Sequence, residues 1–218
     1  MEFSEFLPVW DRLTEDQRAL LESRLISRTM KKGERIRAGA PNCMGLLLIR
    51  SGQLRASILS EEGREITIYR LIDRDLCLFS AACMLRSIQF EITISAEKDT
   101  ALWVIPADVY QKVMEESAAL ANFTNEVMGT RFSEVMWLME QILWKSFDKR
   151  LAGFLLEEMA IEGTKQLKIT HEAIGNHLGN PREVVTRMLR YFQNEGLVLL
   201  SRGTVEILEE KQLQRIAR

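Results

Sequence analysis

The chain has 218 residues, of which 46% are hydrophobic, so it can bury one large core or two modest ones. The formal net charge of −2 excludes a polycation that binds nucleic acid without sequence preference. No apolar run reaches transmembrane length, the first residues lack the basic start of a signal peptide, and three cysteines do not make a disulfide framework. We therefore expect a cytoplasmic protein with reduced thiols.

Short strand-like runs dominate residues 20–105, after an amphipathic helix that Thr14 caps and that extends to about Leu25. The runs lie at 45–50, 53–59, 65–71, 90–94 and 101–105, and several alternate apolar with polar residues. The segment Ser60-Glu61-Glu62-Gly63 is a candidate hairpin turn. Many short strands at regular spacing predict a double-stranded β-roll, a jelly-roll-like fold.

A helical pattern extends from Val109 to about Lys145, and we interpret it as a dimerisation helix. Its predicted seam has spacings of 4, 3, 4 and 3 and comprises Met128, Phe132, Val135, Met139 and Ile142. This a/d spacing is typical of a parallel coiled coil, so we expect a homodimer; the alternative is a buried helix without a dimer role. A second stripe is expected to face the β-roll and comprises Leu120, Phe123, Val127, Leu138 and Leu143.

The last third of the chain has the pattern of a helix-turn-helix followed by a β-hairpin. Thr170 caps a first helix over 171–178, and Gly179 supplies the turn. Asn180 is expected to cap a second helix, with Pro181 at its first position and Glu183 closing a capping box. Residues 197–200 and 204–208 predict two strands around Ser201-Arg202-Gly203. We place one domain at 1–146 and a second at 147–218, in an α+β chain.

Basic side chains gather in this segment, where residues 165–202 hold 6 Lys+Arg and 3 Asp+Glu. Arg182, Glu183 and Arg187 lie at the start of the second helix, and these residue types can read base edges in the major groove. Candidates for phosphate contacts are Lys168, Thr170, Arg190 and Arg202. The alternatives are a solvated basic face, or a helix pair that mediates protein contacts only.

These motifs resemble the CRP/FNR family of bacterial transcription regulators. The family motif I-T-x-x-x-I-G-x-x-x-G-x-x-R-E-x-V-x-R is matched by Ile169-Thr170, Ile174-Gly175, Gly179, Arg182-Glu183, Val185 and Arg187. The resemblance implies a sensor domain at 1–146, formed by the β-roll and the dimer helix, and a winged helix-turn-helix DNA-binding domain at 147–218. By resemblance, Arg182 and Arg187 would contact guanine, and Glu183 would accept from cytosine N4. Relatives of the cyclic-nucleotide-binding type have a serine and a threonine where this chain has Pro181 and Val184, and the loss of these hydroxyls puts two phosphate contacts in doubt.

The resemblance does not extend to a cyclic nucleotide site. Family members that bind one have a Gly-Glu pair for the ribose and an Arg-Ser or Arg-Thr pair for the phosphate. Aligned positions here hold Leu78-Phe79 and Phe90-Glu91, and Arg86-Ser87 would restore the second pair only in a shifted register. We therefore expect no response to cyclic AMP and an unidentified effector instead. Its expected pocket comprises Cys77, Leu78, Phe79, Met84, Phe90 and Trp103.

We expect no metal and no cofactor. Three cysteines fall short of the four thiolates of an iron–sulfur cluster, and both histidines, His171 and His177, lie in the DNA-binding segment. A haem with a cysteine ligand stays an alternative, and so does a thiol switch at Cys77 and Cys83, which flank the expected pocket. A jelly-roll enzyme would need histidines among its strands, so we expect no enzyme and no catalytic residues.

A dimer places two recognition helices about one DNA turn, roughly 34 Å, apart. The sequence therefore predicts a homodimeric transcription regulator whose partners are a palindromic operator in double-stranded DNA and, for an activator, RNA polymerase. No membrane partner is expected.

Overall fold

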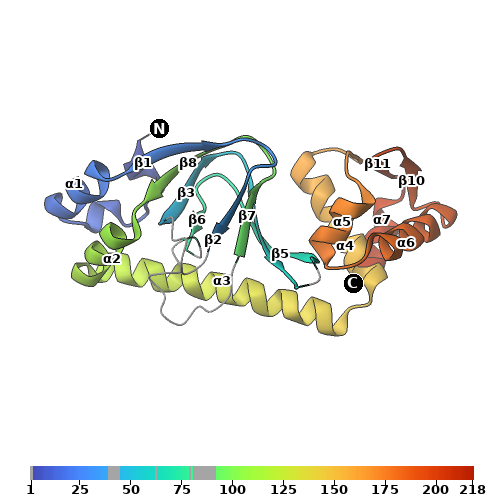
Figure 1. The fold of residues 1–218 in the computed structure, drawn as a ribbon. Helices are drawn as coiled ribbons and strands as arrows, with labels where there is room; N and C mark the ends of the chain where they lie inside the picture. The colour runs from blue at the N-terminus through green and yellow to red at the C-terminus, as the bar shows by residue number, and fades with distance from the viewer. Residues whose placement is uncertain (1, 39–44, 62, 79, 81–91) are drawn as a thin grey trace. The chain divides into compact units, whose positions relative to one another are not determined.

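The computed structural model describes residues 2–38, 45–61, 63–78, 80 and 92–218 (Figure 1). The chain forms two compact units, residues 1–59 with 68–135 and residues 60–67 with 136–218. The fold is α+β, as predicted. A β-sheet domain comes first, a long helix follows, and a helical domain with a small sheet ends the chain.

Two four-stranded sheets form the β-roll of the first unit. One has the order β1-β8-β3-β6 and the other β2-β7-β4-β5. The strands of the first sheet, in that order, are Ile26–Met30, Thr100–Ile105, Leu46–Ser51 and Leu76–Cys77. Those of the second are Arg35–Ala38, Ile92–Ala96, Leu54–Leu59 and Glu65–Leu71. β8 pairs antiparallel with both β1 and β3, and β7 with both β2 and β4.

The five predicted strands are confirmed as β3, β4, β5, β7 and β8, although residues 90 and 91 lie outside the described part of the chain. Strands β1, β2 and β6 were not predicted. β1 and β2 stand first in their sheets, so each has a single neighbouring strand. Polar residues at 27–29 interrupt the apolar pattern of β1, and β2 and β6 have only four and two residues, too few for a clear period.

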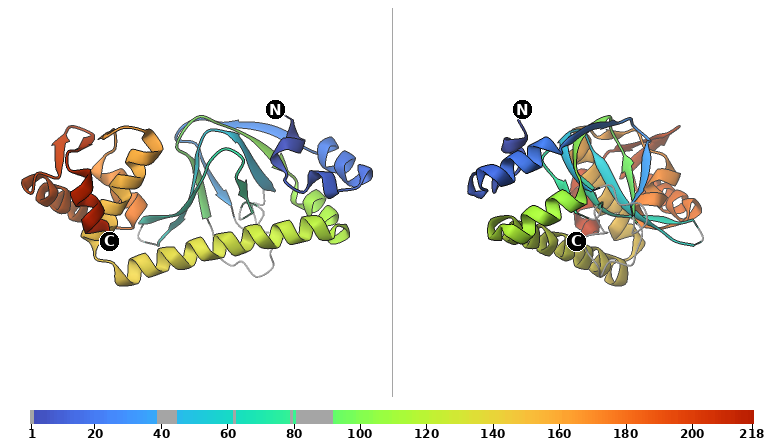
Figure 2. Two further views of the ribbon diagram at one scale, coloured as in Figure 1. Left: turned by 180° about the vertical axis from the view of Figure 1, so that it is seen from behind. Right: turned by 60° about the vertical axis from the view of Figure 1, so that its left-hand side comes forward.

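Both faces of β3, in the first sheet, are buried from Leu46 to Ile49. Leu47 and Ile49 of β3 face the core between the two sheets, whereas Leu46 and Leu48 join a second core. The 3-10 helices η1 (Phe3–Phe6) and η2 (Trp10–Arg12) and helices α1 (Glu15–Ser23) and α2 (Ala107–Glu116) build that second core. α1 and α2 lie beside each other in both views of Figure 2. Because neither face meets water there, the sequence of β3 is apolar without a break from Leu46 to Ile49.

The predicted cap of α1 is confirmed. The Thr14 hydroxyl accepts from Gln17 N, and the Gln17 side chain accepts from Thr14 N, which makes a capping box. The single helix predicted from Val109 to Lys145 was wrong, because α2 ends at Glu116 and α3 spans Ala118–Trp144. Between them Ser117 is extended, and its Oγ accepts from Leu120 N at 3.3 Å. The serine thus begins a new helix.

Helix α3 packs on the β-roll with a face that includes part of the predicted seam. Met128 and Val135 pack against the core between the sheets. The other seam residues, Phe132, Met139 and Ile142, are exposed, and so is Leu143, which we expected to face the roll. The exposed apolar stripe therefore lies about one residue further along the helix than predicted. It comprises Phe132, Met136, Met139 and Leu143.

The C-terminal domain has four helices around one core. They are α4 (Phe147–Glu162), α5 (His171–Leu178), α6 (Arg182–Asn194) and α7 (Glu210–Ala217). A sheet of order β10-β11-β9 completes it, formed by Val198–Ser201, Thr204–Ile207 and Gln166–Leu167. The predicted hairpin is thus present as β10 and β11. Val185, Leu189 and Phe192 of α6 are fully buried in the core.

A buried hydroxyl pair joins α2 to α3 and provides a test of this packing. The Thr124 hydroxyl donates to Leu120 O at 2.7 Å, so the Tyr110 hydroxyl donates to Thr124 Oγ1 at 2.8 Å. Tyr110→Phe deletes the donor and should cost about 1 kcal/mol of unfolding free energy. Thr124→Val leaves the buried tyrosine hydroxyl without an acceptor and should cost about 1–3 kcal/mol.

Urea unfolding followed by circular dichroism measures both costs. Thr130→Val is the matched control, because Thr130 is an exposed threonine of the same helix that donates to Glu126 O. Its effect should stay within about 0.5 kcal/mol. A larger loss for Tyr110→Phe than for Thr124→Val would contradict the assigned donor direction.

Candidate nucleic-acid interface

The turn between α5 and α6 is built as the sequence predicts at its first helix. The Thr170 hydroxyl accepts from Ala173 N at 3.1 Å and caps α5. Gly179 ends α5 in the left-handed conformation with φ of 69°. A side chain at this backbone conformation would be strained, which explains the glycine. The two helices are therefore joined by a short turn of defined geometry.

The predicted cap of α6 was wrong. α6 begins at Arg182 without a side-chain cap, and the Asn180 side chain accepts instead from Arg150 Nη2 at 3.0 Å. Arg150 also donates through Nη1 to Leu178 O at 3.0 Å. One arginine of α4 therefore holds both the end of α5 and the residue that the sequence suggested as the cap. Its position 28 residues before Leu178 gave no signal in the sequence.

The predicted base-reading residues lie together on α6. Arg182, Glu183 and Arg187 are all exposed, Arg182 and Glu183 at the start of the helix and Arg187 one turn later. Glu183 and Arg187 lie on the side away from the buried Val185 and Leu189. No ion pair among the described residues involves either arginine. Both guanidinium groups and the carboxylate are thus free to bind a ligand from solvent.

The predicted phosphate contacts are also exposed. Arg190 lies one turn beyond Arg187 on α6, Lys168 and Thr170 precede α5, and Arg202 lies in the turn between β10 and β11. The Thr170 oxygen is engaged in its cap, but its proton stays available as a donor. Positively charged groups and hydrogen-bond donors therefore lie on α6, in the segment before α5 and in the turn between β10 and β11.

A histidine that sequence reasoning left without a role connects the two helices. The Thr186 hydroxyl donates to Arg182 O at 2.9 Å, so His171 Nδ1–H donates to Thr186 Oγ1 at 2.9 Å. Burial, followed by the charges of Arg182 and Arg190, lowers the pKa of His171 below its usual value. His171 is therefore neutral at pH 7 and fixes α6 against α5 by a neutral hydrogen bond.

Comparison with known proteins identifies the two domains. Residues 149–216 match the Crp-like helix-turn-helix domain, and residues 27–117 match the cyclic nucleotide-binding domain. This chain belongs to the CRP/FNR family of transcription regulators. It is 61% identical to a transcriptional regulator of that family from Eubacterium rectale ATCC 33656. The two structures superpose with a TM-score of 0.95 over 98% of this chain and 99% of that one.

More distant CRP/FNR relatives differ in the signals that their names state. The Global nitrogen regulator of Synechococcus elongatus is 26% identical over 77% of this chain and 79% of its own length. The Cyclic AMP receptor protein of Thermus thermophilus is also 26% identical, over 79% of each chain. Equal identity to both does not select an effector. These relatives are transcription regulators and not enzymes.

The structure separates Cys77 from the other two described residues of the predicted effector pocket. Cys77 lies in the core between the sheets, whereas Leu78 and Trp103 lie in the second core with the N-terminal segment. Neighbouring residues of a strand face opposite sides of a sheet, which separates Cys77 from Leu78. Phe79, Met84 and Phe90, like Cys83 of the thiol hypothesis, lie outside the described residues.

Cys77 is fully buried, and its Sγ is 3.7 Å from the Tyr69 hydroxyl. Burial raises the pKa of the Cys77 thiol, which disfavours the reactive thiolate. In the described part of the chain, His, Cys, Asp and Glu side chains form no group of three suited to a metal ion. Nor does any described helix have the length and apolar character needed to span a membrane.

His171 gives this family member a testable pH dependence. DNA phosphates would offset the repulsion from Arg182 and Arg190, so DNA binding should be coupled to proton uptake at His171. Affinity should rise as pH falls from 7.5 to 5.5, with a salt slope steeper by up to about 0.9. The folded chain loses the stability that neutral His171 contributes as pH falls below about 6.5, because its folded pKa lies below the unfolded value.

Fluorescence anisotropy with a labelled duplex at several salt concentrations measures this effect. His171→Gln should flatten the pH dependence. His177→Gln is the control, since it removes the other of the two histidines. The same pH dependence in His171→Gln and wild type would show that another group takes up the proton.

Proposed function

We propose that this regulator acts in the cytoplasm as a homodimer that reads a palindromic operator. Arg182 and Arg187 bind guanine, and Glu183 accepts from cytosine N4. The observation that carries the proposal is the exposed face of α6, where two unpaired guanidinium groups flank a carboxylate at the helix start. Arginine matches guanine O6 and N7 with two hydrogen bonds, and a carboxylate is the natural acceptor for cytosine N4.

Lys168, Thr170, Arg190 and Arg202 contact phosphates on either side of the bases. They lie on three segments around the recognition helix, so they set its orientation without reading sequence. The chain as a whole is mildly acidic, with a net charge of −2. Nonspecific attraction to DNA is therefore modest, and base contacts must supply a large share of the affinity for an operator.

The dimer is supported by the exposed stripe of α3. Phe132 is 66% exposed, Met136 and Met139 are 47% exposed and Leu143 is 66% exposed. Their spacings of 4, 3 and 4 follow a heptad repeat. Gly129 continues this stripe, and no other atom lies within 4 Å of the place its Cβ would take. The open position allows a second helix to approach closely, so the partner is the same helix of a second chain.

The effector is a small molecule other than cyclic AMP. Leu78 stands where cyclic-nucleotide-binding relatives have the glycine of their ribose pair, and its side chain is buried in the second core. A thiol switch at Cys77 and Cys83 is the alternative signal, and it would require the roll to open because Cys77 is fully buried. RNA polymerase is the further partner if the protein activates transcription.

The base-reading role predicts a contrast between two arginines of α6. Arg187→Ala should cost about 1–3 kcal/mol of binding free energy and relax the choice at one base pair in each half-site. Arg190→Ala should weaken binding about equally on all sequences and lower the salt slope by about one. Anisotropy on a duplex series with every single base-pair change measures both. A uniform loss in Arg187→Ala would contradict its assigned contact.

The dimer seam predicts a loss of association in Met139→Lys. A charge placed in the apolar stripe should produce monomers and abolish operator binding, because one half-site is too weak alone. Ser133→Lys is the matched control, an exposed position of the same helix beside the stripe. Sedimentation velocity measures the mass of both. An intact dimer in Met139→Lys would exclude this seam.

A further inference from the structure

The side chain of Arg150, in the first turn of α4, holds the turn between α5 and α6 at two points. Its Nη1 donates to Leu178 O and its Nη2 donates to Asn180 Oδ1, each at 3.0 Å. Leu178 is the last residue of α5, and Asn180 lies two residues before the start of α6. Because the donors of a guanidinium lie in one rigid plane, the two bonds fix both the distance and the tilt of the turn relative to α4.

Backbone contacts within the turn leave it little freedom to absorb a movement. Asn180 N donates to Gly175 O at 3.0 Å. A Cβ at Gly175 would stand 2.5 Å from Asn180 O, so the glycine is what lets the turn pack this closely. Pro181 follows, and its ring fixes φ, here at −58°. A displacement of Asn180 is therefore passed on to Arg182, the first residue of α6.

The hydrophobic core holds the body of α6 better than its first turn. Val185 is the first residue of α6 in that core, and Leu189 is the next. Arg187 lies between these two buried residues. Arg182 and Glu183 precede both and are exposed, so their positions depend on the turn more than the position of Arg187 does.

Stability alone does not account for an arginine at position 150. Its Nε is buried without a hydrogen-bond partner, and burial lowers the pKa of its guanidinium below the usual value. Within the described residues it forms no ion pair, and both of its acceptors are uncharged. A charge buried without a counter-charge costs free energy. The gain from Arg150 is therefore the geometry that its two hydrogen bonds impose.

We propose that Arg150 is a positioning residue that sets the base choice of Arg182 and Glu183 through Asn180. The proposal rests on the proposed function, in which both residues read bases. A hydrogen bond to a base edge weakens steeply with small errors in distance and angle. A loosened first turn therefore loses base discrimination at these two contacts. Arg187 keeps its discrimination, because the core holds its part of the helix.

Hydrogen–deuterium exchange of the full chain without DNA tests the hold on the turn. Arg150→Gln should raise the exchange of amides between Gly179 and Val185 at least about fivefold and leave those of 188–194 within about twofold. Lys149→Gln is the matched control. It removes the same charge from the preceding residue of α4, which has no hydrogen bond or ion pair within the described part of the chain, and it should exchange like the wild type.

Fluorescence anisotropy tests the effect on base choice. The probe is the two-fold symmetric duplex that the wild-type chain enriches from random DNA, together with every single base-pair change in it. Arg182→Ala, Glu183→Gln and Arg187→Ala first assign the base pair that each residue reads. In Arg150→Gln, discrimination should fall at least about threefold at the pairs of Arg182 and Glu183 and stay within about twofold at the pair of Arg187. Lys149→Gln should discriminate like the wild type.

Asn180→Ala tests the same link with a smaller change, because it removes one of the two acceptors. It should give the same pattern more weakly, and the double variant should lose no more than Arg150→Gln alone. An equal loss at all base pairs in Arg150→Gln, unchanged exchange in the turn, or losses that add in the double variant would each overturn this proposal alone. A wild-type chain without any base-pair preference would overturn the proposed function as well.

Discussion

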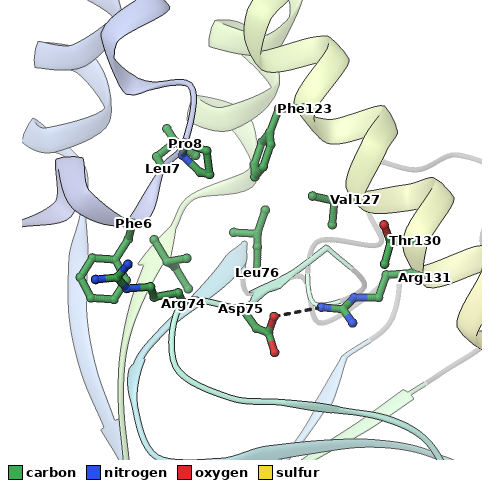
Figure 3. Close-up of a pocket in the computed structure, with 11 residues that line it drawn as sticks. Phe6, Leu7, Pro8, Arg74, Asp75, Leu76, Phe123, Val127, Thr130 and Arg131 are labelled. Carbon is green, nitrogen blue, oxygen red and sulfur yellow. Dashed lines mark ion pairs between the residues drawn. The ribbon is translucent and has the colours of Figure 1, made fainter.

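Helix α3 has apolar side chains on two faces. A residue that packs against the β-roll cannot also contact a second chain. Leu120 is buried against the N-terminal segment and Met128 packs on the core between the sheets, whereas Phe132 and Met139 are exposed. The contact with the β-roll therefore decides which residues stay available for a second chain. A cavity lined by Phe123, Val127 and Arg131 opens against the same packed face (Figure 3).

The fold was predictable where a local signal and the tertiary packing agree. Thr14 and Thr170 cap their helices and Gly179 ends α5 as expected, because each signal needs only neighbouring residues. The break in the long helix was not predicted. Ser117 is extended and caps α3 in the structure, but a single serine within a helical pattern does not by itself indicate a break. β1 escaped notice because three successive polar residues, Ser27 to Thr29, interrupt its apolar ends, and β2 because it has only four residues.

In the candidate site, too, the sequence could locate the residues with local signals but not those that depend on the tertiary fold. Arg182, Glu183 and Arg187 could be placed in the first turns of α6 from the sequence alone, and all three are exposed there. Arg150 could not be found, because a partner 28 residues away leaves no periodic signal. Nor could the cavity around Arg131, whose lining comes from three segments that only the tertiary fold assembles. Of the predicted seam residues, Met128 and Val135 pack on the roll while Phe132, Met139 and Ile142 are exposed, because a heptad spacing does not tell which apolar side chains of a helix meet the roll.

The central claim is that two copies of α6, related by a two-fold axis, read one operator. Selection of binding sites from random duplex DNA with the wild-type chain tests it most directly. The account predicts enrichment of two inverted half-sites whose centres lie about one helical turn, 10–10.5 base pairs, apart, with a G·C pair at each arginine contact. Enrichment of a single unpaired half-site, or of tandem repeats in one orientation, would contradict it.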